Sequence, residues 1–269
     1  THNPHLIVES GMTEPKAKLT VSVIMPALNE EANIADAIRE TLAGMDEFGV
    51  QGEIIVVNDG SRDRTAEIVA EIMRGEPRVR VLTHDAPWGF GNSFWDGVDH
   101  STADVVVVLP GDNENIPTEI FRYFDLLEHV DIVIPFLFNR ETRSPIRNII
   151  SYLYRAIINT SFFVNLNYTN GTVLYRRNIL AEMSSRSGGF FFQTEILVTA
   201  IKQGYLFAEV PYRVGTREGG KSTAVKFPSF VGVVKGYLSL MWDVWMGKRP
   251  ELSKSYFAGS ATCIRRRQK

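Results

Sequence analysis

Short apolar runs rich in β-branched residues alternate with longer amphipathic stretches over most of the chain. The apolar runs predict strands at residues 19–25, 53–58, 79–83, 104–109 and 132–136. The stretches between them predict helices at residues 31–44, 65–74, 92–100 and 118–129. Repeated strand–helix units of this kind predict an α/β fold, with a doubly wound, mainly parallel sheet flanked by helices.

The second and fourth predicted strands contain the uninterrupted apolar runs 54–57 and 105–108. Strands that are covered by helices on both faces show no alternation of polar and apolar residues. In such sheets, ligands bind outside the carboxyl ends of the strands. The residues that follow each strand are therefore the first candidates for chemistry.

The alternation loosens after about residue 138. A basic loop at 140–147 precedes a helical pattern at 147–159, whose Ile149, Ile150, Leu153, Ile157 and Ile158 form an apolar stripe. Short strands are predicted at 172–175 and 206–210, with a helix at 193–203 between them. Residues 227–246 have the length of a membrane span but include Pro228, Lys235 and Asp243. They predict a C-terminal amphipathic helix that packs on the domain or lies on a membrane surface.

The predicted organisation is a flexible lead at 1–18, one domain at 19–226, the amphipathic helix at 227–247 and a basic tail at 248–269. Residues 1–18 contain no apolar stretch of signal-peptide length. The tail carries seven Lys or Arg residues against one Glu. A solvated tail and attraction to an anionic membrane leaflet both remain open for it.

Composition narrows the function classes. The 269 residues are 44% hydrophobic and 22% charged, which excludes wholesale disorder and a fibrous repeat. A net charge of −2 argues against a dedicated nucleic-acid binder. The single cysteine, Cys263, excludes a disulfide framework and a Cys-rich zinc site, and it favours a cytoplasmic setting.

Polar residues follow three of the predicted strands, at 26–30, 58–63 and 110–114. None of these loops is rich in glycine, so the phosphate-cradling turn of a dinucleotide fold is absent from them. Carboxylates and amides suit the edges of a base or a ribose, although Asn, Asp and Gly also simply make turns. The pair Asp112 and Glu114 suits a hard divalent cation, and a solvated acidic loop is the alternative.

These loops carry a family resemblance. Residues 23–31 (VIMPALNEE) and 54–65 (IIVVNDGSRDRT) resemble the first two motifs of the family 2 glycosyltransferases of the GT-A fold. The resemblance continues through 89–91, 172–177, 192–196 and 217–222, and covers about residues 19–245. Within the family the chain is most similar to the dolichyl-phosphate mannosyltransferase branch, which transfers sugars to polyprenyl phosphates.

The resemblance implies a nucleotide-sugar site and a divalent cation, Mg²⁺ or Mn²⁺. The implied donor-binding residues are Pro26, Leu28, Glu30, Asp59, Gly91 and Asp112. Asp112 falls on the second Asp of the family's Asp-x-Asp metal motif, and Pro110 replaces the first. Glu114 stands where the branch has a metal-serving Gln, so it restores the lost carboxylate, and we expect Asp112 and Glu114 to be the metal ligands.

The resemblance also implies an acceptor site and an inverting, single in-line displacement from a UDP- or GDP-linked sugar. The implied phosphate-binding residues are Arg143, Arg147, Arg217 and Ser222, for which a solvated basic face is the alternative. A polyprenyl phosphate acceptor needs little base help, whereas a hydroxyl acceptor needs a general base. Glu195 is the candidate base, and a structural role is equally open for it. The expected catalytic residues are Asp112, Arg147 and Glu195, in an enzyme that is cytoplasmic or peripheral on the cytoplasmic face of a membrane.

Three alternatives remain. Transfer to a hydroxyl of a lipid or glycan is the first. A non-catalytic nucleotide-sugar-binding relic is the second, and Pro110 is its support. The third is an ATPase or GTPase, because residues 215–222 (GTREGGKS) fit a nucleotide-phosphate loop. Pro228 follows that loop closely and no strand is predicted after it, which argues against the third alternative.

Overall fold

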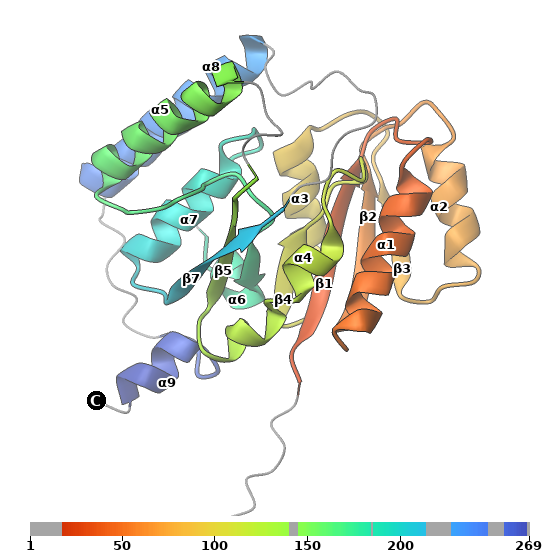
Figure 1. Ribbon diagram of the computed structural model, residues 1–269. Helices are drawn as coiled ribbons and strands as arrows, with labels where there is room; N and C mark the ends of the chain where they lie inside the picture. The colour runs from red at the N-terminus through yellow and green to blue at the C-terminus, as the bar shows by residue number, and fades with distance from the viewer. Residues whose placement is uncertain (1–17, 140–144, 184, 214–226, 247–255, 268–269) are drawn as a thin grey trace, which may run out of the picture.

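The computed structural model describes residues 18–139, 145–183, 185–213, 227–246 and 256–267. Within these residues one seven-stranded sheet has the strand order β3-β2-β1-β4-β6-β5-β7 (Figure 1). The strands are β1 (Thr20–Ala27), β2 (Gln51–Asn58), β3 (Val79–Thr83), β4 (Val105–Val108), β5 (Ile132–Leu137), β6 (Leu174–Arg176) and β7 (Phe207–Tyr212). All pairings are parallel except those of β6 with β4 and β5. The predicted mainly parallel α/β sheet is confirmed.

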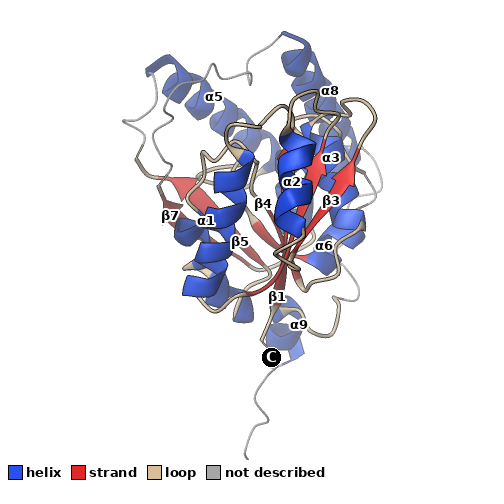
Figure 2. Ribbon diagram, turned by 90° about the vertical axis from the view of Figure 1, so that its right-hand side faces the viewer, coloured by secondary structure: helices blue, strands red, loops and turns tan. Residues whose placement is uncertain are grey.

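Helices cover both faces of this sheet, with α1 and α3 on opposite sides of the strands (Figure 2). The helices are α1 (Ile34–Glu47), α2 (Thr65–Met73), α3 (Phe90–Asp99), α4 (Pro117–Phe121), the 3₁₀ helix η1 (Phe124–Glu128), α5 (Pro145–Phe162), α6 (Arg177–Ala181), α7 (Phe192–Lys202), α8 (Phe227–Trp245) and α9 (Ala261–Arg267). The single helix predicted at 118–129 is divided into α4 and η1. Within η1, Phe124 and Leu127 are both buried, and their spacing of three matches the 3₁₀ helix, in which side chains at i and i+3 lie on one side.

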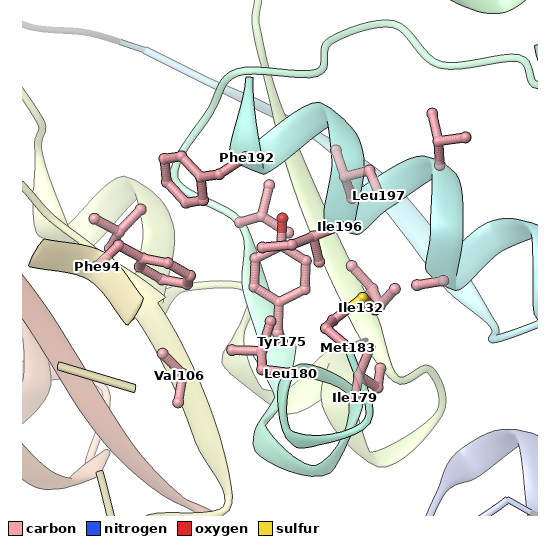
Figure 3. Close-up of a cluster of buried hydrophobic side chains, with 14 of the residues drawn as sticks. Phe94, Val106, Ile132, Tyr175, Ile179, Leu180, Met183, Phe192, Ile196 and Leu197 are labelled. Atoms are coloured by element: carbon pink, nitrogen blue, oxygen red, sulfur yellow. The ribbon is translucent and has the colours of Figure 1, made fainter. Parts of the chain in front are cut away.

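Two buried layers explain the uninterrupted apolar strands. In β4, Val106 and Val108 belong to one hydrophobic cluster, whereas Val105 and Val107 belong to the other. Figure 3 shows the first cluster, in which Phe94 of α3 and Phe192 of α7 close over the sheet. Each strand must therefore present apolar side chains to both faces.

The helices α5 and α8 lie side by side at the end of the molecule opposite α9 (Figure 1). Ser161 Oγ shares a hydrogen bond of 2.7 Å with the Tyr237 hydroxyl, and Trp245 Nε1 donates to the Ser161 carbonyl at 3.0 Å. Of the apolar stripe predicted for α5, only Ile158 is buried, and the other four residues are 53–60% exposed. The stripe is therefore a surface of the molecule and not its core.

The prediction of a solvated basic tail is corrected for part of that segment. Residues 256–267 pack on the domain, and Ala261, Thr262 and Cys263 of α9 are buried. The buried Asp131, just before β5, accepts hydrogen bonds from the Ala261 and Thr262 backbone N–H groups at 2.8 and 3.0 Å, and from the Thr262 hydroxyl. This carboxylate satisfies helix N–H groups that would otherwise require water, so this part of the tail is not solvated chain.

Candidate functional site

The chain reverses its direction of winding between β1 and β4, which are neighbours in the sheet. Ligands of open α/β sheets bind at such a switch point, outside the carboxyl ends of the strands. The loops that follow β1 and β4 are in contact there, because the Gly111 N–H donates to the Pro26 carbonyl at 3.0 Å. A Cβ on Gly111 would lie 2.7 Å from Ile34 Cδ1, so a larger residue here would displace the Ile34 side chain.

The loop after β4 turns sharply at Asn113, whose φ of 55° is tolerated by asparagine better than by most residues. The Glu114 N–H donates to Asp112 Oδ1 at 3.2 Å across this turn. Asp112 and Glu114 both line one cavity. The two residues predicted as metal ligands are therefore brought to the same site.

The loops after β1 and β2 are tied to each other by their own polar side chains. Asn29 Oδ1 accepts from the Arg62 N–H at 2.9 Å, and Ser61 Oγ accepts from the Asn29 N–H at 3.0 Å. Asp63 Oδ2 accepts from the Glu31 N–H at 3.0 Å. The polar side chains of these loops therefore do make turns, as one of the two predictions for them stated. Pro26, Leu28 and Glu30 follow β1, so they lie at the same edge of the sheet as Asp112, which follows β4.

Asp59 is buried and its carboxylate is used inside the protein. Its Oδ1 accepts from the Trp88 N–H at 2.7 Å and bonds to His84 Nδ1 at 2.8 Å, and its Oδ2 accepts from the Gly89 N–H at 2.9 Å. Burial raises the pKa of Asp59, but these hydrogen bonds outweigh it, so that the pKa lies below its ordinary value. The predicted donor-binding carboxylate therefore fastens the loop after β3 to the loop after β2.

Gly91, the other predicted donor-binding residue in this region, lies in the first turn of α3. A Cβ there would lie 2.6 Å from the Gly188 carbonyl carbon. The close approach of these two backbone segments accounts for glycine at this position.

A cavity of about 510 Å³ lies between the loop after β4, α5, α7 and α8. This volume is in the range of small-molecule sites. Four of its lining residues, at positions i, i+4, i+7 and i+8, come from one face of α5: Arg147, Ser151, Tyr154 and Arg155. Of these four residues, only Arg147 was predicted from the sequence. The other three could have been predicted from the sequence, because they lie on the side of the helix opposite the apolar stripe.

Further lining residues connect α5 with α7 and with the loop before β6. The Tyr154 hydroxyl shares a hydrogen bond of 2.8 Å with Thr194 Oγ1, which in turn contacts Asn170 Oδ1 at 3.3 Å. Burial raises the pKa of Tyr154 to about 12, against a smaller lowering by Thr194, so the phenol is neutral at physiological pH. Gln193 Nε2 donates to the Gly171 carbonyl at 2.9 Å. Tyr154, Asn170 and Gln193 are brought together only by the packing of α5, α7 and the loop before β6.

Glu195 is not part of the described cavity lining. Its Oε1 accepts from Ser185 Oγ at 2.6 Å and its Oε2 accepts from the Ser187 N–H at 2.8 Å, and the residue is buried. These contacts favour the structural role over the role of general base. The predicted phosphate-binding residues Arg143, Arg217 and Ser222 lie outside the described residues, as does the possible phosphate loop at 215–222.

The carboxylates of Asp112 and Glu114 fit a hard divalent cation. Mg²⁺ is commonly held by one or two carboxylates, with phosphate oxygens of the substrate and water completing its ligands. Among the described residues no group of three or more His, Cys, Asp or Glu side chains gathers at one point.

The chain was compared with models of known protein families to establish its family. The model of glycosyl transferase family 2 matches residues 22–184, which include the loops after β1, β2 and β4. The chain belongs to glycosyl transferase family 2. The family resemblance inferred from the sequence is therefore confirmed.

Named relatives of this family 2 chain include two undecaprenyl-phosphate 4-deoxy-4-formamido-L-arabinose transferases. The one from Edwardsiella ictaluri is 36% identical over 112 residues, which are 41% of this chain and 34% of the relative. The one from Shewanella sediminis is 29% identical over 167 residues, which are 61% of this chain and 50% of the relative. The matches thus span between a third and a half of the length of these relatives.

Solved structures share the fold. Glucosyl-3-phosphoglycerate synthase from Mycobacterium tuberculosis in complex with UDP aligns with a TM-score of 0.65 at 22% identity, over 84% of this chain and 81% of that one. Its complex with Mn²⁺, UDP-glucose and phosphoglyceric acid aligns with a TM-score of 0.64 at 20% identity, over 84% and 80% of the two chains. The predicted GT-A-like architecture is confirmed by these alignments.

Proposed function

We propose that this family 2 glycosyltransferase moves a sugar, with inversion, from a UDP- or GDP-linked donor to a polyprenyl phosphate. One observation carries the proposal. The cavity that holds Asp112 and Glu114 is bounded by α5, which contributes Arg147 to the cavity and carries an exposed apolar stripe that reaches the cavity at Ile150. A charged site beside an apolar surface suits a phosphate on a long hydrocarbon chain. The names of the two relatives above, which act on undecaprenyl phosphate, support the same acceptor class.

Three charged residues of the cavity, Asp112, Glu114 and Arg147, have distinct roles in this proposal. Asp112 and Glu114 would hold a divalent cation, Mg²⁺ or Mn²⁺, which when bound supplies positive charge to the diphosphate leaving group. Arg147 offers a planar fork of donors that matches phosphate oxygens. Pro26, Leu28 and Glu30 line the edge where the nucleoside would lie. The acceptor's anionic oxygen attacks the anomeric carbon, and the donor's diphosphate departs from the opposite side.

A hydroxyl acceptor is the less favoured alternative, because it would require a general base in the cavity. Glu195 is engaged with Ser185 and Ser187 and does not line the described cavity. Tyr154 lines it, but a phenol with a pKa of about 12 is a weak base candidate near neutral pH. A phosphate acceptor is already anionic and does not need either residue.

The test is a transfer assay with UDP- and GDP-linked sugars, with Mg²⁺ or Mn²⁺ present. Vesicles contain either undecaprenyl phosphate or undecaprenol, so the two acceptors differ only in the phosphate. We expect labelled lipid with undecaprenyl phosphate and about background with undecaprenol, because only the former is an anionic nucleophile. Product from undecaprenol alone would contradict the proposed acceptor. Thermal stabilisation by UDP, GDP or their sugars without transfer to either lipid would favour the non-catalytic relic, which still binds the nucleotide.

We also propose that α5 and α8 rest on the cytoplasmic face of a membrane. Their exposed apolar residues, here named the apolar face, are Ile146, Ile149, Ile150, Leu153, Ile157, Phe163, Leu238, Trp242 and Met246. So large a group of exposed apolar side chains marks a contact with lipid or protein. None of the described helices has the length and apolar character to cross a bilayer. A lipid acceptor favours a peripheral contact in the plane of the interface.

Placing charge on the apolar face should separate membrane binding from donor binding. The double variant Leu153→Glu/Ile157→Glu adds two anions where apolar side chains would enter the interface, so binding to anionic vesicles should fall by at least about 10-fold. Phe48→Glu is the control, since Phe48 is also an exposed apolar residue but follows the far end of α1. Vesicle sedimentation measures the lipid contact, and thermal shift with nucleotide reports the donor site. Unchanged sedimentation of the double variant would contradict the membrane contact.

A further inference from the structure

Trp88 is an exposed residue that the protein holds in place with buried groups. The residue is 56% exposed, yet its indole stacks on the buried His84 ring, with a centroid distance of 3.9 Å and an interplanar angle of 15°. Its backbone N–H donates to Asp59 Oδ1 at 2.7 Å, and its carbonyl accepts from Asn92 Nδ2 at 2.8 Å. One face of the indole is therefore covered and fixed, while much of the residue remains open to solvent.

The His84 ring is itself clamped at both nitrogens. Nδ1 bonds to Asp59 Oδ1 at 2.8 Å and Nε2 bonds to Asp96 Oδ2 at 3.1 Å. Asp59 comes from the loop after β2 and Asp96 from α3, so two separate elements determine the orientation of the ring. Such a network fixes the ring plane, and through stacking it also fixes the plane of the indole.

This platform lies at the edge of the sheet where the donor loops meet. The backbone N–H of His84 donates to the Asn58 carbonyl at 3.0 Å, and the backbone N–H of Asp59 donates to the Ala27 carbonyl at 2.9 Å. The loop before Trp88 also packs so closely on Gly60 that a Cβ there would lie 2.7 Å from the Ala86 carbonyl carbon. These contacts join the loops after β1, β2 and β3 into one surface that includes the indole.

We propose that the open face of the Trp88 indole stacks on the base of the nucleotide donor, and that His84 is the positioning residue that holds the indole in place. The inference rests on the proposed use of a nucleotide-linked sugar. It assigns Asp59 a different part from the one the sequence suggested. The Asp59 carboxylate, whose described hydrogen bonds are all internal, organises the stacking residue instead of reading the base itself.

Stacking makes a specific prediction about which part of the nucleotide is affected. An aromatic platform binds the flat base and does not contact the diphosphate, so Trp88→Ala should weaken UDP or GDP binding by about 5- to 100-fold. Binding of inorganic pyrophosphate with Mg²⁺ should be unchanged. Trp88→Phe keeps a ring and should retain affinity within about threefold of the wild type. Isothermal titration calorimetry measures the nucleotide affinities of both variants and the affinity for pyrophosphate. In a separate measurement, quenching of tryptophan fluorescence by UDP or GDP should be lost in Trp88→Phe.

Two further variants separate positioning from general damage. Phe48→Ala removes another exposed aromatic residue and should leave nucleotide affinity unchanged. His84→Ala should weaken nucleotide binding in the wild-type background but not in the Trp88→Ala background, because it acts through the indole. If the wild type binds UDP or GDP and Trp88→Ala binds it equally well, the stacking inference is overturned while the proposed function stands. If the wild type binds neither nucleotide, both are overturned.

Discussion

Replacement of Asp112 by asparagine is expected to lower the transfer rate by about 10²- to 10³-fold, the effect of removing one group that stabilises developing charge. The variant keeps the shape of the side chain, and the Asn oxygen can still accept from the Glu114 N–H, which bonds to Asp112 at 3.2 Å. It removes one of two carboxylates proposed to hold the cation. Higher Mg²⁺ or Mn²⁺ concentrations should restore part of the lost rate, so the assay is run as a metal titration.

Glu114→Gln should have a smaller effect than Asp112→Asn. The amide oxygen can still serve as a metal ligand, but the charge that compensates for Pro110 is lost. The matched control is Glu40→Gln, because Glu40 Oε1 accepts from Asn113 Nδ2 at 3.3 Å on the exposed side of the same loop. We expect this control to retain the wild-type rate. Wild-type metal dependence in both Asp112→Asn and Glu114→Gln would show that the loop after β4 is not the metal site.

The second large effect concerns stability. Asp131→Ala is expected to lower the free energy of unfolding by about 3–5 kcal/mol, because two backbone N–H groups and one hydroxyl lose their buried acceptor. Burial also lowers the pKa of Arg176, and the charge of Asp131 counteracts that effect, so the variant leaves a buried cation less compensated. Removal of Asp131 should therefore release α9 and weaken the sheet around β5 and β6.

Urea denaturation followed by circular dichroism measures this change. Asp125→Ala is the control, since Asp125 is an exposed acidic residue on the neighbouring η1 and should change stability by less than about 0.5 kcal/mol. Asp131→Asn should fall between the two, because its amide presents one acceptor and one unfavourable donor to the same groups. An unchanged midpoint for Asp131→Ala would mean that α9 contributes little to the folded state.

Features that depend only on residues close together in the sequence could be predicted from the sequence. The buried strands, the turn residues that follow them and the motif spacing all depend on neighbours within a few positions, and the predicted α/β sheet and family are confirmed. The pairing of Asp112 with Glu114 is of this kind, since a single turn brings both to the cavity. Arg147 was also predicted as a site residue, because the family resemblance implied a phosphate-binding arginine at this position, which periodicity alone did not indicate.

Other features depended on partners far apart in the sequence. An apolar stripe at helical spacing looks the same whether it faces a core or a lipid surface, so the exposure of the α5 stripe required the packed position of α5. Glu195 is similar to a catalytic carboxylate in sequence, but its contacts with Ser185 and Ser187 remove it from the cavity lining. The burial of α9 follows from Asp131, which lies 130 residues from Ala261.

The chain by itself thus determined the sheet, the order of its loops and the chemistry at the strand ends, because periodicity and turn residues act over short distances. The tertiary structure decided which of those polar side chains line a cavity and which are used to hold the loops together. Asp59, His84 and Trp88 show the physical reason. Their roles come from burial and from contacts between the loops after β2 and β3, and these contacts form only when the sheet brings its carboxyl ends to one edge.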